Sequence, residues 1–201
     1  MPSLVGSEMC IRDRIYVVDK RQELHFVQVF RAAKKTGIVP EDTKLSFLGF
    51  GTMNGKDGKP FKTREGGVMR LESLIAEIEE EMYKKITDNR TVEEEEAKET
   101  AKIVGLSAIR YGDLSNQASK DYIFDVDRFT SFEGNTGPYI LYTIVRIKSI
   151  LNKYQAEGKE AAGLTMTAAK SDSEKALMLE VAKYNEVIEN AYEELAPHKI
   201  C

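Results

Sequence analysis

The sequence of 201 residues predicts an α/β segment followed by a mainly α-helical bundle, so that the chain is mostly α overall. Two observations predict this order. Apolar, β-branched or aromatic runs at residues 15–18 and 44–50 flank one amphipathic helical pattern over about 22–35. From Leu71 onwards the apolar residues recur with helical spacing, and this pattern continues to the last residues. A short α/β part therefore precedes a helical array.

The α/β part has the size of one strand–helix–strand unit of a parallel sheet. Residues 15–18 have the composition of a buried strand, and residues 44–50 form the second strand candidate. Gly37 is expected to end the helix between them. The apolar side of that helix consists of Phe26, Val27, Phe30 and Ala33.

Capping patterns and apolar stripes define the helices that follow. Thr91 with Glu94, and Ser171 with Glu174, have the spacing of capping boxes, and Pro138 is a favoured first-turn residue. The first of these helices has an apolar stripe formed by Leu71, Leu74, Ile75, Ile78 and Met82. The helix after Thr91 runs through Ala97, Ala101 and Val104. The expected buried side of the helix after Pro138 consists of Tyr139, Ile140, Ile144, Ile147 and Leu151.

Composition excludes some classes of protein. Hydrophobic residues make up 42% and charged residues 31%, and no apolar run is long enough for a membrane-spanning helix. The net charge of −4 gives no general signal for binding polyanions. Cys10 and Cys201 lack metal-ligand spacing, which favours a reducing, cytoplasmic setting. Residues 1–14 have neither a signal-peptide core nor any periodicity, so we interpret them as a non-native leader.

A glycine-rich basic loop over residues 51–67 follows the second strand, where parallel sheets bind ligands. Its glycines allow backbone amides to approach a ligand closely. It matches neither the dinucleotide fingerprint nor the P-loop, and a solvated basic hairpin is the alternative interpretation. The side chains that can gather around phosphates are Lys56, Lys59, Lys62, Thr63 and Arg64.

Several segments together resemble arginyl-tRNA synthetase, a class I aminoacyl-tRNA synthetase. Phe-Lys-Thr-Arg-x-Gly at 61–66 stands where class I enzymes place their KMSKS signature, although it departs from that consensus. The most specific segment is Phe-Glu-Gly-Asn-Thr-Gly-Pro-Tyr-Ile at 132–140. The order of Asp19-x-x-Gln22-x-x-His25, Ile-Arg-Tyr-Gly-Asp-Leu at 109–114 and Asp-Tyr-Ile-Phe-Asp at 121–125 also resembles the family. The resemblance spans about residues 15–201.

This resemblance implies a domain organisation and a reaction. Residues 15–70 would be the end of a Rossmann-like catalytic domain, 71–119 connecting helices, and 120–201 the start of an α-helical anticodon-binding domain. The reaction would activate L-arginine with ATP, accompanied by Mg²⁺, to arginyl-adenylate and transfer it to tRNA(Arg). The parent enzyme would be cytoplasmic with no membrane partner; its oligomeric state stays open, with a monomer favoured.

The resemblance also assigns candidate site residues. Those expected to bind ATP phosphates and stabilise the leaving pyrophosphate are Lys59, Lys62, Thr63 and Arg64. Gln22 and His25 would line the arginine and adenosine pocket, whereas from the residues alone they read as a capping Gln and a partly buried structural His. Candidates for tRNA contact are Asn135, Tyr139 and Arg146. The alternative interpretation is that Asn135 belongs to a helix-entry turn, that Tyr139 is a core residue and that Arg146 is an ordinary surface charge. No metal-binding cluster is visible.

The family's other ATP signature, HIGH, and its guanidinium-recognising acidic residues do not occur in the chain. We therefore expect that these 201 residues alone do not charge tRNA. Three alternatives stay open: a non-catalytic tRNA-binding helical module, a structural helical adaptor, and a class I synthetase of another specificity, such as cysteine. The absence of zinc-ligand cysteines and the Phe-Lys-Thr-Arg spelling argue against the last.

Overall fold

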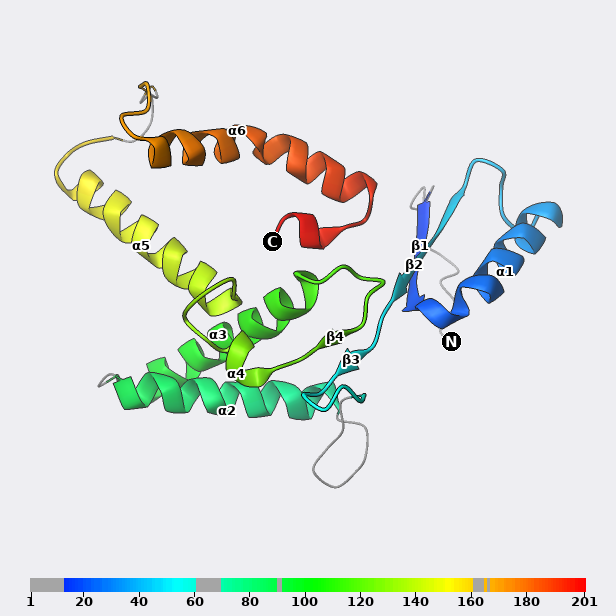
Figure 1. Ribbon diagram of the computed structural model, residues 1–201, viewed down its shortest axis with the longest axis horizontal. Coiled ribbons are helices and arrows are strands. Elements are labelled where there is room, and N and C mark those ends of the chain that lie inside the picture. Colours follow the sequence, from blue (N-terminus) through cyan, green and yellow to red (C-terminus); the bar gives the residue numbers. More distant parts are fainter. Residues whose placement is uncertain (1–12, 61–69, 90–91, 161–164, 166) are drawn as a thin grey trace. The chain divides into compact units, whose positions relative to one another are not determined.

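A computed structural model describes residues 13–60, 70–89, 92–160, 165 and 167–201 (Figure 1). The chain divides into two compact units. The N-terminal unit contains the described residues up to Thr52 together with Ala118–Tyr122. The helical unit contains Met53–Gln117 and Ile123–Cys201. Each unit is described by itself below.

The N-terminal unit is built on two parallel strands joined by a helix, as the sequence predicts. Strand β1 covers Asp13–Asp19, a 3-10 turn η1 covers Lys20–Gln22, helix α1 covers Glu23–Lys35, and strand β2 covers Lys44–Phe50. The register places Tyr16 beside Phe47 and Asp19 beside Phe50. Helix α1 is followed by Gly37 at φ 72°, a left-handed conformation that suits glycine.

Aromatic rings join α1 to one face of this sheet. Tyr16 of β1 lies 5.3 Å from Phe26 and 5.1 Å from Phe30, measured between ring centroids, and Phe26 lies 5.6 Å from Phe47 of β2. These separations are typical of favourable tilted ring pairs. The predicted apolar side of α1 is confirmed, since its four residues are half-buried.

The opposite face of β1 differs from the prediction of a buried strand. Because side chains alternate across a strand, Ile15 and Val17 point away from the face that carries Tyr16. Their side chains are 47% and 58% exposed, respectively. Within the described residues, α1 covers only one face of the β1–β2 pair, and this explains the exposure.

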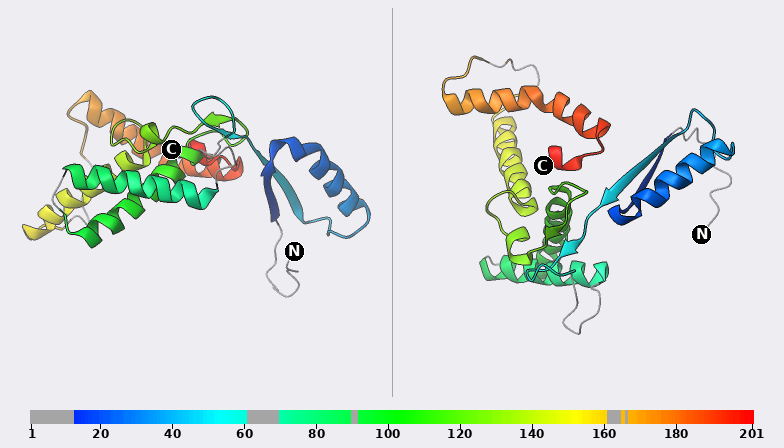
Figure 2. Two further views of the ribbon diagram at one scale, coloured as in Figure 1. Left: turned by 90° about the horizontal axis from the view of Figure 1, so that it is seen from below. Right: turned by 45° about the vertical axis from the view of Figure 1, so that its right-hand side comes forward.

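Two packed helices form the core of the helical unit. Helix α2 covers Leu71–Asn89 and helix α3 covers Glu94–Leu114, and they lie side by side in Figures 1 and 2. The α2 stripe is confirmed except at Leu71, which is 62% exposed at the first turn. The most deeply buried side chains of the pair, each at 0 to 4% exposure, are Leu74, Ile78, Met82, Ala97, Ala101 and Ala108.

Short elements lie before and after this pair in the chain. Strand β3 covers Met53–Asn54, strand β4 covers Tyr122–Ile123, and helix α4 covers Val126–Phe129. Phe124 is 1% exposed and packs on Phe129, with ring centroids 4.7 Å apart. Gly112 of α3 faces the Phe129 ring so closely that a Cβ there would lie 2.9 Å from it. Glycine therefore permits this contact between α3 and α4.

Helix α5 covers Gly137–Ala156, helix α6 covers Asp172–Glu193, and a 3-10 turn η2 covers Pro197–Lys199. Pro138 lies in the first turn of α5 and Ser171 caps α6, as predicted. Thr91, the residue predicted to cap α3, lies outside the described residues; the N-cap of α3 is Glu93, which makes no side-chain capping bond. None of the helices in the described part of the chain is long and apolar enough to span a membrane.

The predicted buried side of α5 is also wrong. Its five residues are 38 to 52% exposed, and only Gly137 and Pro138 of this helix are buried. Helix α5 meets α3 at its first turn, where a Cβ on Gly137 would lie 2.2 Å from the carbonyl oxygen of Ser107. Beyond that turn the described residues leave the apolar positions of α5 largely uncovered.

Candidate functional site

The carboxyl ends of β1 and β2 lie at one edge of the parallel pair, where such sheets bind ligands. Gln22 ends η1 directly after β1, and His25 lies in the first turn of α1. Both side chains are exposed. Gln22 precedes α1 without making a side-chain capping bond, and His25 is not the partly buried residue of the alternative interpretation. Amide and imidazole groups at this edge are thus available to a ligand.

A local ion pair shapes the same edge. Arg21 donates from Nε and from a terminal nitrogen to the two carboxylate oxygens of Asp19, at 2.9 and 2.6 Å, and its backbone N–H donates to Asp19 at 2.8 Å. These side-chain and backbone hydrogen bonds from Arg21 lower the pKa of Asp19 from 3.8 to about 2. Asp19 is therefore ionised at neutral pH and is engaged by its own neighbour.

A second segment, residues 118–121, closes the edge beside β2. Asp121 accepts hydrogen bonds from Lys20 Nζ at 2.9 Å and from the Thr52 backbone N–H at 2.8 Å, and both lower its pKa, with Lys20 the larger cause. Gly51 donates its N–H to the Ala118 carbonyl at 2.8 Å. A Cβ on Gly51 would lie 2.3 Å from the Lys120 carbonyl oxygen, so only glycine allows this approach.

The start of the basic loop is a compact hairpin in the helical unit. The hairpin, residues 54–60, is held by a hydrogen bond from Gly55 N–H to the Lys59 carbonyl at 2.8 Å and by a bridge between Asn54 and Pro60. Gly58 lies at φ 71°, as its turn requires. Lys59 is exposed, so its ammonium is directed to solvent from a fixed backbone. Lys62, Thr63 and Arg64 lie outside the described residues.

Lys56 of this hairpin has a different setting from Lys59. Its Nζ lies 2.8 Å from Asp127 Oδ2 and 3.1 Å from Asp125 Oδ1. Hydrogen bonds with Asp127 and then Asp125 raise the pKa of Lys56, and Lys56 lowers that of Asp127. The Lys56 ammonium, which was expected to help bind phosphates, is therefore already paired with two carboxylates.

Of the three candidates for RNA contact in the helical unit, Asn135 lies just before α5, Tyr139 in its first turn and Arg146 in its middle. Asn135 Oδ1 accepts a hydrogen bond from the Tyr111 hydroxyl of α3. Tyr139 is 42% exposed, which excludes the core position given as its alternative. The Arg146 guanidinium lies 5.7 Å from the ring centre of Tyr142 and donates to its hydroxyl at 3.3 Å. Arg146 and Tyr142 thus form an exposed cation–aromatic pair.

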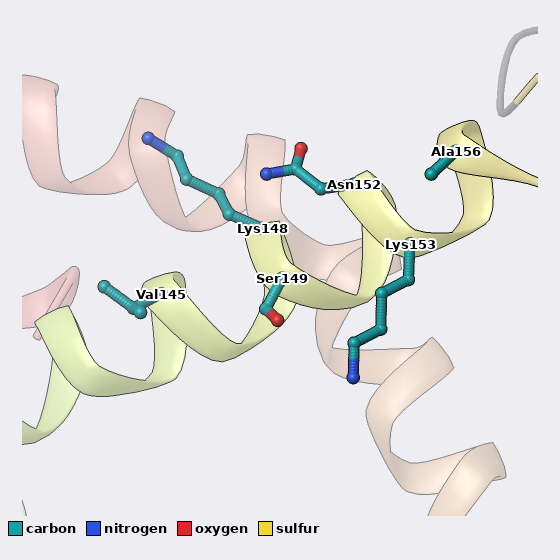
Figure 3. Close-up of a pocket in the computed structure, with 6 residues that line it drawn as sticks. All are labelled: Val145, Lys148, Ser149, Asn152, Lys153 and Ala156. Atoms are coloured by element: carbon teal, nitrogen blue, oxygen red, sulfur yellow. The ribbon is translucent and has the colours of Figure 1, made fainter.

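An open hollow follows the later turns of α5 and has a volume of about 460 Å³ (Figure 3). The polar ends of Lys148 and Asn152 point to one side of the helix, whereas Ser149 and Lys153 point to the other. These groups do not converge on one point, so the hollow has no arrangement for chemistry. Within the described ranges no group of three His, Cys, Asp or Glu side chains is placed to hold a metal ion.

Comparison with protein families assigns the two parts of the chain. Residues 7–126 match the family described as tRNA synthetases class I (R), catalytic domain, and residues 140–201 match the DALR anticodon binding domain. The first match alone covers more than half of the 201 residues. The chain belongs to the arginyl-tRNA synthetase family.

Individual members of the arginyl-tRNA synthetase family are similar over almost the whole chain. An arginine–tRNA ligase of Agathobacter rectalis is 64% identical over 195 residues, and one of Alkaliphilus oremlandii is 60% identical over 187. Each match covers 93% of this chain but only 33% and 32% of those proteins, so the chain spans about a third of their length.

Solved structures of the same family share the fold. The arginyl-tRNA synthetase of Thermus thermophilus matches with a TM-score of 0.71 and that of Plasmodium falciparum with 0.68, both at 25% identity. The matches cover 94% of this chain and 30% and 31% of those structures, respectively. The predicted fold class, an α/β segment followed by a mainly helical region, is thereby confirmed, and so is the resemblance to this family.

The sequence did not predict how the polar residues of the candidate site pair with one another. Lys20 with Asp121, and Lys56 with Asp125 and Asp127, pair across 101 and about 70 residues of chain. No local motif joins partners so far apart. The Asp-Tyr-Ile-Phe-Asp segment at 121–125 and the Asp-x-Asp spacing at 125–127 are visible in the sequence, but neither indicates a partner.

Proposed function

We propose that this chain acts as part of an arginine–tRNA ligase, which activates arginine with ATP to arginyl-adenylate and transfers it to tRNA(Arg). The observation that carries the proposal is the 64% identity, over 93% of the chain, to the arginine–tRNA ligase of Agathobacter rectalis. Class I tRNA synthetases use ATP in general, which fits a basic hairpin that begins directly after a parallel strand pair.

In the first half of the reaction, an arginine carboxylate oxygen would attack the α-phosphate of ATP, and pyrophosphate would leave. Negative charge then grows on the leaving oxygens, and fixed cations directed at them lower the barrier. Lys59, Lys62, Thr63 and Arg64 are the groups we assign to this role. Magnesium would enter bound to the phosphates of ATP, since the described residues present no cluster of ligands of their own.

Gln22 and His25 are the residues that we assign to the adenylate. Both are exposed at the carboxyl end of β1, and both side chains can form hydrogen bonds with the adenylate. Asp19 is held by Arg21 and is therefore less available to the substrate guanidinium. This arrangement supports adenylate binding by the amide and imidazole groups at the strand end.

Residues of the later part would contact tRNA. The match to an anticodon binding domain over residues 140–201 supports this role, and Asn135 and Tyr139 lie just before it. The exposed Tyr142–Arg146 pair offers a flat ring and a guanidinium, which can stack on unpaired bases or pair with phosphate. We propose the domain division of the catalytic end at 15–70, connecting helices at 71–119 and the anticodon-binding part at 120–201.

A chimeric enzyme, called the graft below, tests the proposed function directly. Residues 13–201 would replace the matching third of the Agathobacter rectalis ligase, and arginine-dependent pyrophosphate exchange would be measured. We expect the graft to be active, and Lys59→Ala or Lys62→Ala within it to lower the rate by about two orders of magnitude, as at other anion-stabilising sites. Residues 13–201 alone should show no exchange.

Two outcomes would contradict the proposal. A stably folded graft without arginine-dependent exchange would argue against the ligase assignment, all the more if the chain bound tRNA in a salt-sensitive way, as a non-catalytic module would. Exchange that depended on another amino acid would assign a different specificity. The unmodified Agathobacter rectalis enzyme, assayed in parallel, provides the reference rate.

A further inference from the structure

Lys56 is one lysine of the basic hairpin whose charge is already shared between two carboxylates. Its Nζ lies 2.8 Å from Asp127 and 3.1 Å from Asp125. A cation held by two anions attracts a phosphate much less than a free one, because the net charge of the three groups is negative. The described contacts of Lys56 therefore fit an anchor better than a phosphate ligand.

The partners of Lys56 belong to a short, well-anchored helix. Asp125 is the N-cap of α4, and its Oδ1 accepts hydrogen bonds from the backbone N–H groups of Asp127 and Arg128. Phe124 and Phe129, on either side, are 1% and 7% exposed. Asp125 and Asp127 thus project from backbone that is fixed by buried rings, and they provide a rigid base for Lys56.

The hairpin side of the contact is also held by hydrogen bonds. Asn54 accepts a backbone hydrogen bond from Phe124 at 2.8 Å, so the first strand of the hairpin is joined to the segment that leads into α4. Asp57 Oδ1 accepts from the Lys59 backbone N–H at 3.1 Å. Asn54 and Lys56 hold the first side of the hairpin against the segment that contains α4. The hydrogen bond from Gly55 N–H to the Lys59 carbonyl then fixes the backbone of Lys59 relative to that side.

We propose that Lys56 is a positioning residue: through Asp125 and Asp127 it fixes the hairpin of residues 54–60 on α4, so that Lys59 meets ATP in one orientation. The inference rests on the proposed function, because Lys59 has a substrate to meet only if the enzyme binds ATP. Two lysines three positions apart therefore have different roles: Lys59 is directed at the nucleotide, and Lys56 holds the turn.

The test uses the graft of residues 13–201 in the Agathobacter rectalis ligase. KM and kcat for ATP and KM for arginine would be measured by pyrophosphate exchange. The proteins compared are the graft without substitutions (the native graft) and its variants Lys56→Ala, Lys56→Arg and Asp127→Asn. We expect Lys56→Ala to raise KM for ATP about fivefold, the size of effect that exposed ion pairs produce, and to leave KM for arginine unchanged. Lys56→Arg should stay close to the native values, and Asp127→Asn should lie between.

A matched control is available on α3. Lys98 also lies between two carboxylates, with Glu94 at 2.6 Å and Glu95 at 3.9 Å, and its side chain is exposed to a similar degree, 54% against 62% for Lys56. Its partners are on its own helix and it does not touch the hairpin. Lys98→Ala should leave both KM values unchanged.

A charge exchange separates an anchor from a phosphate ligand. The double variant Lys56→Glu with Asp127→Lys restores the ion pair but places a carboxylate on the hairpin. An anchor predicts recovery of most of the ATP affinity that Lys56→Glu alone loses, whereas a direct phosphate contact predicts no recovery and would overturn the inference. So would an unchanged KM for ATP in Lys56→Ala, or equal changes in both KM values together with a lower unfolding temperature. An inactive native graft would instead count against the proposed function.

Discussion

At the scale of single residues, Asp19 and Arg21 show how one side chain sets the charge of another at a strand end. The hydrogen bonds from the Arg21 side chain and backbone lower the pKa of Asp19 to about 2. A carboxyl group with a lowered pKa in the folded state stabilises that state above its unfolded value of 3.8. This contribution is lost as the pH falls through about 2. Arg21 is exposed and Asp19 is half-buried, so solvent screens the pair and its effect on stability is small.

Arg21→Ala should raise the pKa of Asp19. The side-chain hydrogen bond is the larger cause of the shift, and its loss should move the pKa towards 3.8. The shift should be incomplete, because the backbone N–H at position 21 still donates to the carboxylate. Carboxyl ¹³C NMR titration of the chain measures this, with Arg31→Ala, an exposed arginine on α1, as the control. An Asp19 pKa that stayed near 2 in Arg21→Ala would contradict the assigned cause.

At the scale of elements, glycine sets how closely helices approach one another. Gly137 begins α5 against α3, and a Cβ there would lie 2.2 Å from the Ser107 carbonyl oxygen and 2.5 Å from its carbon. Backbone atoms inside a helix cannot move away without breaking hydrogen bonds. Gly105 lies in α3, the same helix as Ser107, and faces α2. It has more room than Gly137, since a Cβ on Gly105 would lie 3.4 Å from Ile78 Cγ2.

Gly137→Ala should therefore lower the free energy of unfolding by about 1–3 kcal/mol, as overpacking does. Gly105→Ala is the matched control: its close contact is tolerable, and alanine in a helix interior gains about 0.5–1 kcal/mol over glycine. Urea unfolding followed by helical circular dichroism measures both. If Gly137→Ala were as stable as the native chain, the α3–α5 contact would be looser than these distances require.

Helices and strands could be predicted from the sequence where they depend on residues close together in the chain. The bounds of β2 and α1, the parallel connection and the buried stripe of α2 follow from residue patterns within a few turns of chain. Tyr16 and Phe47 illustrate the limit of this reasoning. Both lie in strands predicted from local composition, but their shared packing on Phe26 depends on a register that no single strand specifies.

The failures concern partners that lie far away in the sequence. The period of α5 correctly predicted a helix, but the exposure of Ile147 depends on what packs there, and the described residues bring α3 only to the first turn. Likewise, the basic composition of the loop did not distinguish Lys56 from Lys59. That distinction depends on Asp125 and Asp127, which reach Lys56 only through the tertiary fold.

At the scale of the whole molecule, the two compact units differ in how much apolar surface they bury. Among the described residues of the N-terminal unit, Val39 is the one buried apolar side chain, at 8% exposure. The helical unit buries Ile78, Met82, Ala97 and Ala108 completely. A two-stranded pair covered on one face is marginal in water, whereas two long helices packed through small residues are not. Local unfolding should therefore begin in the N-terminal unit.

Hydrogen exchange should reveal this order. In native buffer, backbone amides of β1, α1 and β2 should exchange faster than those of α3 between Ala97 and Ala108. The reason is that exchange requires opening, and opening the N-terminal unit exposes less buried apolar area. Peptides covering residues 44–50 and 97–108, followed by mass spectrometry over the same time course, give the comparison directly. The exposed turns of α5 after Leu141 serve as an internal standard for fast exchange within the helical unit. Protection of 44–50 equal to that of 97–108 would mean that the two units unfold as one cooperative body, and the difference in their cores would then have no bearing on stability.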